Sequence, residues 1–439
     1  MVFGASTQRR QGTQRSERPH ARSGRSTSSI LHASRLFFVL WVLCVLCVPS
    51  SDAALAQEPN APQTVSAEQL KAAIDKLGDL DYAARTNAAR TIRRTPAAQA
   101  VPALIQAVSD HADGYVRYRA LVLLTGFNDP RAKGSLREAL ASPNDRLRAV
   151  AYSYYEHNPD PSMLTQLERA LDAEQGEFVR PALVRALAAL CAHLDRTSGI
   201  ARNDVLRLEA SLVRDVNRGE DFFRSAVIEA LGDYKAAYAY DAVTAIAKQD
   251  GPLQDDAALA VGRIGDKRAL ETLAAMQRNA PRQMQPSIAA AICLLGVNCE
   301  SHETYLAETL KFADKNLGYQ ELLRGAAAGL GAIAIAGHAD AIRALFDVGL
   351  PARDDSTRAP VALALATVAL RNTPMMLAAL EARADRDKAI ELLGEGFDML
   401  EEDLDKERFF ALARRLYWES PETSPRRALM QTLIGALDF

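Results

Sequence analysis

Residues 253–262, with the sequence LQDDAALAVG, decide the fold of this chain. The stretch opens on an apolar residue, continues with small and apolar side chains at helical spacing, and closes on Gly262 before Arg263-Ile264-Gly265-Asp266. This spacing predicts an amphipathic helix. Its alanines favour helix formation and leave room for a second helix to approach closely.

The same ten-residue pattern recurs along the chain, usually with an arginine at its second position. These arginines are Arg85, Arg117, Arg148, Arg180, Arg224, Arg358, Arg386 and Arg426. Copies that begin at Ser287 and Leu322 lack the arginine but keep the ending. Successive copies start about 33 residues apart, a period typical of two short antiparallel helices and two turns. The chain should therefore be all-α.

The repeated pattern resembles HEAT repeats, in the short variety called phycobilisome-lyase HEAT-like repeats. The resemblance extends over residues 68–439. It implies an α-solenoid, or superhelix, of about ten to eleven stacked antiparallel helix pairs, with the second helices along the concave face. One helix pair cannot bury both of its apolar stripes, so stacking must complete the core. We expect one elongated domain.

Composition limits the classes of partner. The sequence is 48% hydrophobic and 6% aromatic, and its formal net charge is -3. A nucleic acid partner is not expected, because phosphate neutralisation requires a clustered surplus of Lys and Arg. The motifs of nucleotide-binding, hydrolytic and zinc-dependent enzymes are absent from the sequence. We therefore expect no catalytic residues, no cofactor and no metal.

The first 56 residues differ from the rest. A basic leader precedes thirteen apolar residues at 36–48, and Ala54-Leu55-Ala56 follows them. This order is typical of a secretory signal that is cleaved after Ala56. Thirteen helical residues extend only about 20 Å, short of a hydrocarbon core of about 30 Å, so an uncleaved anchor is the less favoured alternative. The prediction is an exported protein, periplasmic or extracellular, with a linker at 57–67 and the solenoid at 68–439.

Cys191, Cys293 and Cys299 remain after such a cleavage. In an oxidising compartment, Cys293 and Cys299 are candidates for a local disulfide. His302 follows them, but the spacing matches no standard zinc pattern and a fourth ligand is missing. Two unpaired thiols are the other alternative.

Tyrosines and arginines in the N-terminal half suggest a surface for a protein or peptide partner. The repeat register places Tyr118 and Tyr152 away from the core between paired helices, beside Arg117, Arg148 and Arg180. Exposed Tyr and Arg are enriched at protein interfaces. A surplus of about eleven residues near 192–203 predicts a surface loop beside them. The alternative is structural, with the arginines reaching turns of neighbouring repeats and nearby acids capping helices.

The function predicted from these features is a non-catalytic interaction scaffold that binds a protein or peptide on its curved surface. Two alternatives stay open, an accessory lyase of the phycobilisome-lyase type and a structural subunit of an envelope assembly. The acidic run at 395–405 is interpreted as a solvated helix face, and the apolar residues 325–337 as tight core.

Overall fold

The computed structural model describes residues 64–194 and 202–439. The predicted signal segment, most of the predicted linker and most of the predicted surface loop therefore lie outside the described residues. Within the described ranges the chain forms 22 α-helices, four short 3₁₀ helices and no strand. The prediction of an all-α solenoid is confirmed.

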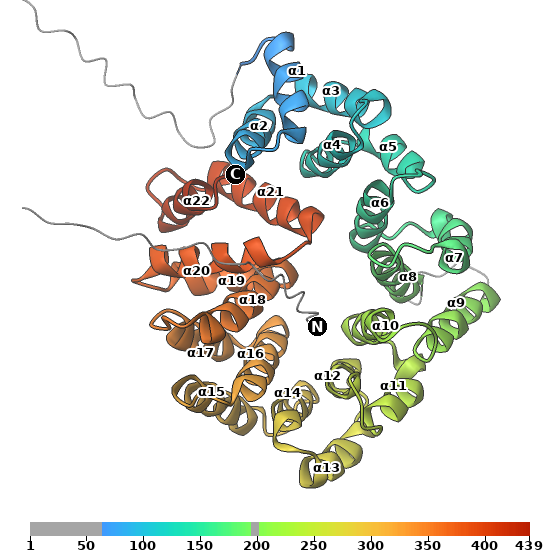
Figure 1. Cartoon of the computed structure of the whole chain (residues 1–439), viewed down its shortest axis with the longest axis vertical. Coiled ribbons are helices and arrows are strands. Elements are labelled where there is room, and N and C mark those ends of the chain that lie inside the picture. The colour runs from blue at the N-terminus through green and yellow to red at the C-terminus, as the bar shows by residue number, and fades with distance from the viewer. Residues whose placement is uncertain (1–63, 195–201) are drawn as a thin grey trace, which may run out of the picture. The chain divides into compact units, whose positions relative to one another are not determined.

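The helices form eleven antiparallel pairs in chain order (Figure 1). The first helices of the pairs are α1 (Ala67–Asp75), α3 (Ala97–Asp110), α5 (Ala132–Ala139), α7 (Leu164–Ala173), α9 (Arg202–Asp215), α11 (Tyr240–Ala247), α13 (Ala269–Asn279), α15 (Cys299–Lys315), α17 (Ala339–Gly349), α19 (Thr373–Glu381) and α21 (Asp403–Glu419). The second helices are α2 (Tyr82–Arg94), α4 (Gly114–Gly126), α6 (Asp145–His157), α8 (Arg180–Leu194), α10 (Asp221–Asp233), α12 (Gln254–Ile264), α14 (Gln285–Leu294), α16 (Gln320–Ile335), α18 (Asp355–Arg371), α20 (Arg386–Met399) and α22 (Pro425–Ala436).

The second helices pack against one another in a continuous row from α2 to α22. The glycine that ends the repeated pattern lies where two of them cross. A Cβ atom on Gly262 of α12 would lie 2.5 Å from Cα and 2.6 Å from the carbonyl oxygen of Ala291 in α14. Only a residue without a side chain allows this approach. The same explanation holds for Gly232 of α10, where a Cβ atom would lie 2.9 Å from Cα of Ala260 in α12.

The arginine at position two of the pattern binds the end of the helix before it. Nε of Arg117 donates to the carbonyl oxygen of Val108 at 2.7 Å, and Nε of Arg224 to that of Val216 at 3.0 Å. These carbonyls belong to the last turns of first helices, or follow them directly, where no intrahelical donor is available. Arg148 also reaches Glu174 of the next pair at 2.7 Å. The structural interpretation of these arginines is confirmed at these positions.

Helix α16 confirms the interpretation of residues 325–337 as core for most of that range, while Ala328, Ala336 and Gly337 are exposed. Its buried side chains include Ala326, Leu330 and Ile333, and they face α14, α15 and α18. Within the described residues no single helix is both long and apolar enough to cross a membrane. Only α18 and α19 together meet that test of length and composition, and they are bent by 117° at the break between them.

The C-terminal end of the stack contacts its N-terminal end. Helix α21 packs against α4 and α6, and Figure 1 shows the last helices on the same side of the molecule as α2. Arg90 of α2 forms an ion pair with Asp438. The expectation of an elongated domain was therefore wrong for residues 64–439. Repeat periodicity describes how neighbouring units stack, whereas this closing contact joins units at opposite ends of the sequence.

Candidate functional site

The closing contact is built around a buried carboxylate on α21. Glu407 is 1% exposed, and its carboxylate accepts hydrogen bonds from Nε and Nη2 of Arg93 on α2 at 2.9 and 2.6 Å. Nη2 of Arg414 lies 3.3 Å from the same carboxylate. Gly126 of α4 provides the space for it, because a Cβ atom there would collide with Oε1 of Glu407. Two arginines thus compensate one buried negative charge.

One turn earlier, Asp403 binds helix α4. Its Oδ2 accepts a hydrogen bond from Nη1 of Arg119 at 2.7 Å and another from the hydroxyl of Tyr118, while Nζ of Lys406 lies 3.2 Å from Oδ1. Burial alone would raise the pKa of Asp403, but the charges of Arg119 and Lys406 and the hydrogen bond from Tyr118 together outweigh it and hold that pKa below its usual range. Burial and the nearby Asp403 both raise the pKa of Tyr118, so its hydroxyl stays a donor.

Asp405 connects α21 to α6 and α18. Nε2 of His157 lies 2.6 Å from Oδ1 of Asp405, and Nη1 of Arg371 lies 3.6 Å from Oδ2. Nη2 of Arg371 also pairs with Glu402 at 3.0 Å. Burial, followed by the charge of Asp405, raises the pKa of Glu402 even though Arg371 is near. Arg371 therefore offsets only part of the effect of burial on Glu402.

The ion pairs continue along the row of second helices. Arg185 of α8 lies 2.8 Å from Glu156 of α6 and 3.0 Å from Asp233 of α10, and Tyr234 donates to Glu156 at 2.8 Å. Arg263 of α12 reaches Asp233 at 3.1 Å. Charged side chains thus follow the inner face of the row from α6 to α12.

A groove opens where the segment before α21 meets α4, α6 and α8. We call it the closure groove, and its cavity volume is about 230 Å³. Its lining contains five acidic side chains and two arginines beside apolar residues. The lining residues are Tyr118, Ala149, Val150, Ser153, Glu156, Phe178, Pro181, Ala182, Arg185, Arg371, Glu401, Glu402, Asp403, Leu404 and Asp405.

An aromatic pair borders the closure groove. Phe178, just before α8, is 75% exposed, and Phe222 at the start of α10 is 39% exposed. Their ring centroids are 6.3 Å apart in an edge-on arrangement. Large aromatic side chains that pack on each other at the surface, rather than in the core, are typical of contact sites for other molecules.

The tyrosines predicted to bind a partner are not exposed. Tyr118 is 8% exposed and Tyr152 is 2% exposed. The expectation that they face solvent was wrong, because positions that face away from the paired helix are covered here by neighbouring units and, for Tyr118, by α21. Tyr118 still lines the closure groove. Burial, with the charge of Glu174 second, raises the pKa of Tyr152 to about 12.

The three arginines of the predicted partner surface serve the scaffold. Arg117 and Arg148 bind carbonyl oxygens and, for Arg148, Glu174, as described above. The guanidinium of Arg180 lies 3.6 Å from the centroid of the Phe223 ring, close to the base of the aromatic pair. Their role in partner binding stays a prediction.

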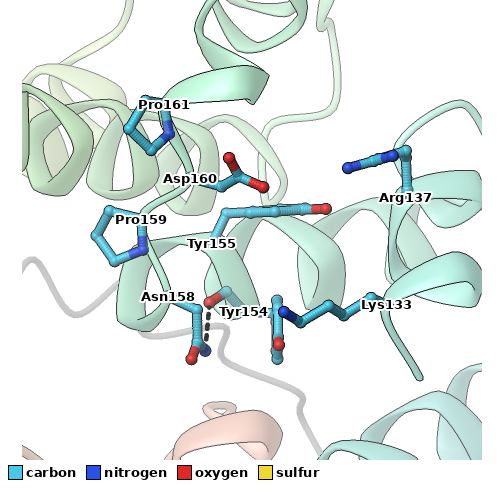
Figure 2. A pocket seen from close by; sticks show the side chains of 8 residues that line it. All are labelled: Lys133, Arg137, Tyr154, Tyr155, Asn158, Pro159, Asp160 and Pro161. Atoms are coloured by element: carbon cyan, nitrogen blue, oxygen red, sulfur yellow. Dashed lines mark hydrogen bonds between the residues drawn. The ribbon is translucent and has the colours of Figure 1, made fainter. Parts of the chain in front are cut away.

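A second pocket, of about 360 Å³, lies between α5 and α6 (Figure 2). Lys133 and Arg137 of α5 face Tyr154 and Tyr155 of α6. Asp160 forms part of the same wall and accepts hydrogen bonds from Ser162 at 2.9 and 2.7 Å. The acid offsets part of the positive charge, so this pocket has less net charge to attract a partner than the closure groove.

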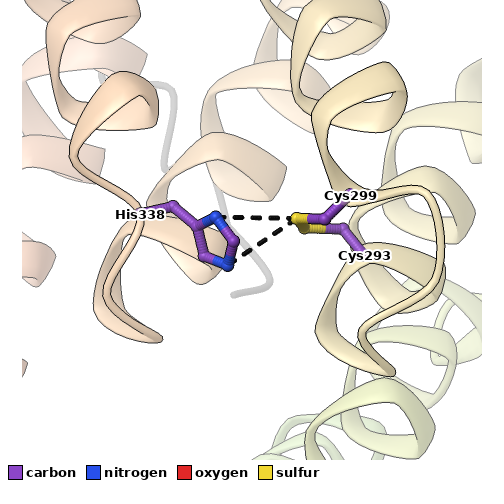
Figure 3. Close-up of side chains that lie close together, drawn as sticks. All are labelled: Cys293, Cys299 and His338. Atoms are coloured by element: carbon purple, nitrogen blue, oxygen red, sulfur yellow. Dashed lines mark hydrogen bonds between the residues drawn. A yellow bond between two sulfur atoms is a disulfide. The ribbon is translucent and has the colours of Figure 1, made fainter.

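Cys293 and Cys299 form a disulfide between the end of α14 and the start of α15 (Figure 3). The histidine beside them is His338, at the start of α17, rather than His302 of the sequence pattern. Sequence spacing could not identify His338, because it lies about forty residues further along the chain and only stacking of the helix pairs brings it near.

The sequence also concealed the closure groove. The acidic run at 395–405 was interpreted as a solvated face, yet Asp405 is buried. Arg119 and Arg185 were the available signals, since they place charges on the second helices at positions outside the recurring arginine. A charge on a helix face that should pack against neighbours indicates a buried partner of opposite sign.

Eleven stacked helix pairs whose second helices form one row define an α-solenoid. The sequence profile of HEAT repeats matches residues 68–154 and 101–188. The chain therefore carries HEAT repeats, and the later helix pairs continue the same stacking to α22. Its narrower assignment to the phycobilisome-lyase variety stays a prediction.

Solved structures of similar fold are larger proteins. The match with a crystal structure of importin beta covers 84% of this chain and 55% of the importin beta chain, with 15% sequence identity and a TM-score of 0.38. The match with Kap121p bound to Pho4p covers 84% of this chain and 51% of the Kap121p chain, with 12% sequence identity and a TM-score of 0.28. The chain spans about half the length of these proteins, and the likeness concerns the fold alone. A comparison with curated protein sequences found no match.

Proposed function

We propose that this chain is an exported, non-catalytic scaffold that binds a protein segment in the closure groove. The observation that carries this proposal is the exposed Phe178 at the border of a groove with surplus negative charge. The expected occupant is an extended segment that presents a basic side chain next to an aromatic or large aliphatic one.

Charge complementarity supports a basic occupant. Glu156, Asp403 and Asp405 already have cationic partners within the fold. Glu401 is exposed at the edge of the groove, and the pKa of Glu402 is raised by burial first and by Asp405 second. An arginine or lysine placed beside Glu401 and Glu402 would add a positive charge next to two carboxylates, and complementary charge also guides the orientation of a bound segment.

The aromatic pair supports an apolar neighbour for that basic residue. Phe178 and Phe222 hold each other in a fixed edge-on arrangement, so little conformational entropy is lost when a partner side chain packs against them. Burying such a ring from water contributes roughly 1.5–3 kcal/mol. The ring and the acidic edge together distinguish a basic-apolar segment from one of acidic residues.

The first prediction concerns peptide binding. Fluorescently labelled ten-residue peptides that alternate Arg with Phe should bind the protein, and peptides with Glu in place of Arg should not. Phe178→Ala should raise the dissociation constant about thirty-fold, as expected when an interface residue contributes about 2 kcal/mol to the free energy of binding. Fluorescence anisotropy measures both.

A matched control is Leu317→Ala, because Leu317 is 84% exposed and lies outside the closure groove. Its dissociation constant should equal that of the unchanged protein. Equal affinity of Phe178→Ala, or equal binding of the Arg and Glu peptides, would contradict the proposed site. A photoreactive amino acid at position 178 should then crosslink the natural partner in cells, and one at position 317 should not.

The second prediction concerns export. We expect the protein recovered from outside the cytoplasm to begin at Gln57, because Ala54 and Ala56 provide the small side chains that signal cleavage requires. Ala56→Arg should block cleavage, whereas Ala61→Arg, five residues further along, should not. Intact-mass spectrometry measures the outcome. A chain that keeps residues 1–56 in the unchanged protein would contradict this part of the proposal.

A further inference from the structure

Three helix pairs contribute to a cluster of side chains suited to a metal ion. Cys293 lies near the end of α14, Cys299 begins α15, and His338 directly precedes α17 (Figure 3). Within the described residues, one ligand atom from each lies within 4.8 Å of the other two. The cluster is remote from the closure groove in the sequence and shares none of its lining residues.

The spacing between sulfur and nitrogen matches a tetrahedral site. Both ring nitrogens of His338 lie 3.6 Å from Sγ of Cys299. Zinc–sulfur and zinc–nitrogen bonds of about 2.3 and about 2.05 Å at a tetrahedral angle place the two ligand atoms about 3.6 Å apart. The imidazole can therefore share a zinc ion with the Cys299 thiolate without moving away from it.

A carboxylate stands behind the histidine. Glu303 lies one turn after Cys299 on α15, and its Oε2 is 3.7 Å from Nδ1 of His338. Its Oε1 is buried and has no hydrogen-bond partner. Histidines that bind metals usually donate their other ring N–H to a carboxylate, which fixes the orientation of the ring. Glu303 is placed to accept the Nδ1 proton, which would leave the lone pair of Nε2 free to bind a metal.

We propose that the reduced protein binds one Zn²⁺ through Cys293, Cys299 and Nε2 of His338, with Glu303 as the positioning residue for the imidazole. The fourth coordination position is left for water or a partner side chain. This inference does not depend on the proposed function of the closure groove.

The disulfide and the metal site exclude each other, because both use the same two sulfur atoms. A small disulfide such as oxidised glutathione can accept the two electrons of the thiolates. The two zinc–sulfur bonds and the bond of the small disulfide break, the Cys293–Cys299 bond forms, and two protons complete two glutathione thiols. Zn²⁺ is released without a change in its own oxidation state. The site would thus report the redox state of its compartment.

Cobalt(II) provides the direct test, because thiolate ligands give it an intense charge-transfer absorption. The full chain with Cys44→Ser and Cys47→Ser, reduced and then freed of reductant, should bind one Co²⁺ with that absorption, and Zn²⁺ should displace it. The disulfide form, mixed with Co²⁺, should show no charge-transfer absorption. Added oxidised glutathione should release the metal as the disulfide forms.

Variants distinguish this site from adventitious binding by thiols. His338→Gln keeps both cysteines and should weaken Co²⁺ binding by at least 100-fold, and Glu303→Gln should weaken it about 10- to 100-fold. His302→Gln, on the same segment but outside the cluster, should bind as the unchanged protein does. Circular dichroism checks that each variant is folded. No charge-transfer absorption in the reduced protein, or equal affinity of His338→Gln, would overturn the proposal.

Discussion

Glu407→Ala is expected to lower the free energy of unfolding by about 3–5 kcal/mol, the usual cost of removing one partner from a buried ion pair. The substitution removes the carboxylate that Arg93 and Arg414 both contact, in a region where Arg93 is 6% and Arg414 13% exposed at the side chain. It also removes the ion pair between α2 and α21. Chemical denaturation measures the loss, and hydrogen exchange should locate the increased opening in α2, α4 and α21.

Glu419→Ala, on the same helix, is the matched control. Glu419 forms only a long, exposed pair with Arg415 at 3.9 Å, and exposed pairs contribute little. Its stability should stay close to that of the unchanged protein. Equal denaturation curves for Glu407→Ala and Glu419→Ala would show that the closing contact does not depend on the buried carboxylate.

Gly262→Ala is expected to destabilise the protein by roughly 1–3 kcal/mol, although alanine normally favours a helix over glycine. The added methyl group would lie 2.5 and 2.6 Å from backbone atoms of Ala291, and backbone cannot move aside as the end of a side chain can. Helices α12 and α14 would have to separate, which weakens packing on both sides of the crossing. Denaturation midpoints measure the effect.

Gly134→Ala is the control, because we expect it to change the stability of the protein in the opposite direction. Gly134 lies inside α5, and nothing lies within 4 Å of a Cβ atom placed there. The substitution should be neutral or stabilise the protein by up to about 1 kcal/mol through helix propensity. Destabilisation by both substitutions, in equal amounts, would contradict the packing explanation for Gly262.

Local features of the fold could be predicted from the sequence because each depends on residues within one or two repeats. Gly262 contacts Ala291, about thirty residues further along the chain, at the crossing of α12 and α14. Arg117 and Arg224, at position two of their copies, each bind a carbonyl eight or nine residues before them. Arg358 donates in the same way to the carbonyl oxygen of Gly349, nine residues before it, so a single sequence contains several examples of the same signal.

The candidate site could not be predicted in the same way, because its residues meet only once. Arg93 contacts Glu407, and Tyr118 contacts Asp403, across most of the length of the chain. No periodicity connects such positions. The predicted exposure of Tyr118 assumed an open stack, and it was wrong for that reason. Phe178 was missed because it lies just before the copy that begins at Val179, at a position for which the repeated pattern makes no prediction.

The contact between α21 and α4 has a consequence for how such a protein can change during evolution. An open solenoid gains or loses a unit by duplication or deletion, since each unit meets only its neighbours. Here an added or deleted helix pair would shift α21 relative to Arg93, Arg119 and His157, and their charges would be buried without partners. A change in the number of units would therefore require a new closing contact, whereas a substitution inside one unit affects only that unit and its neighbours.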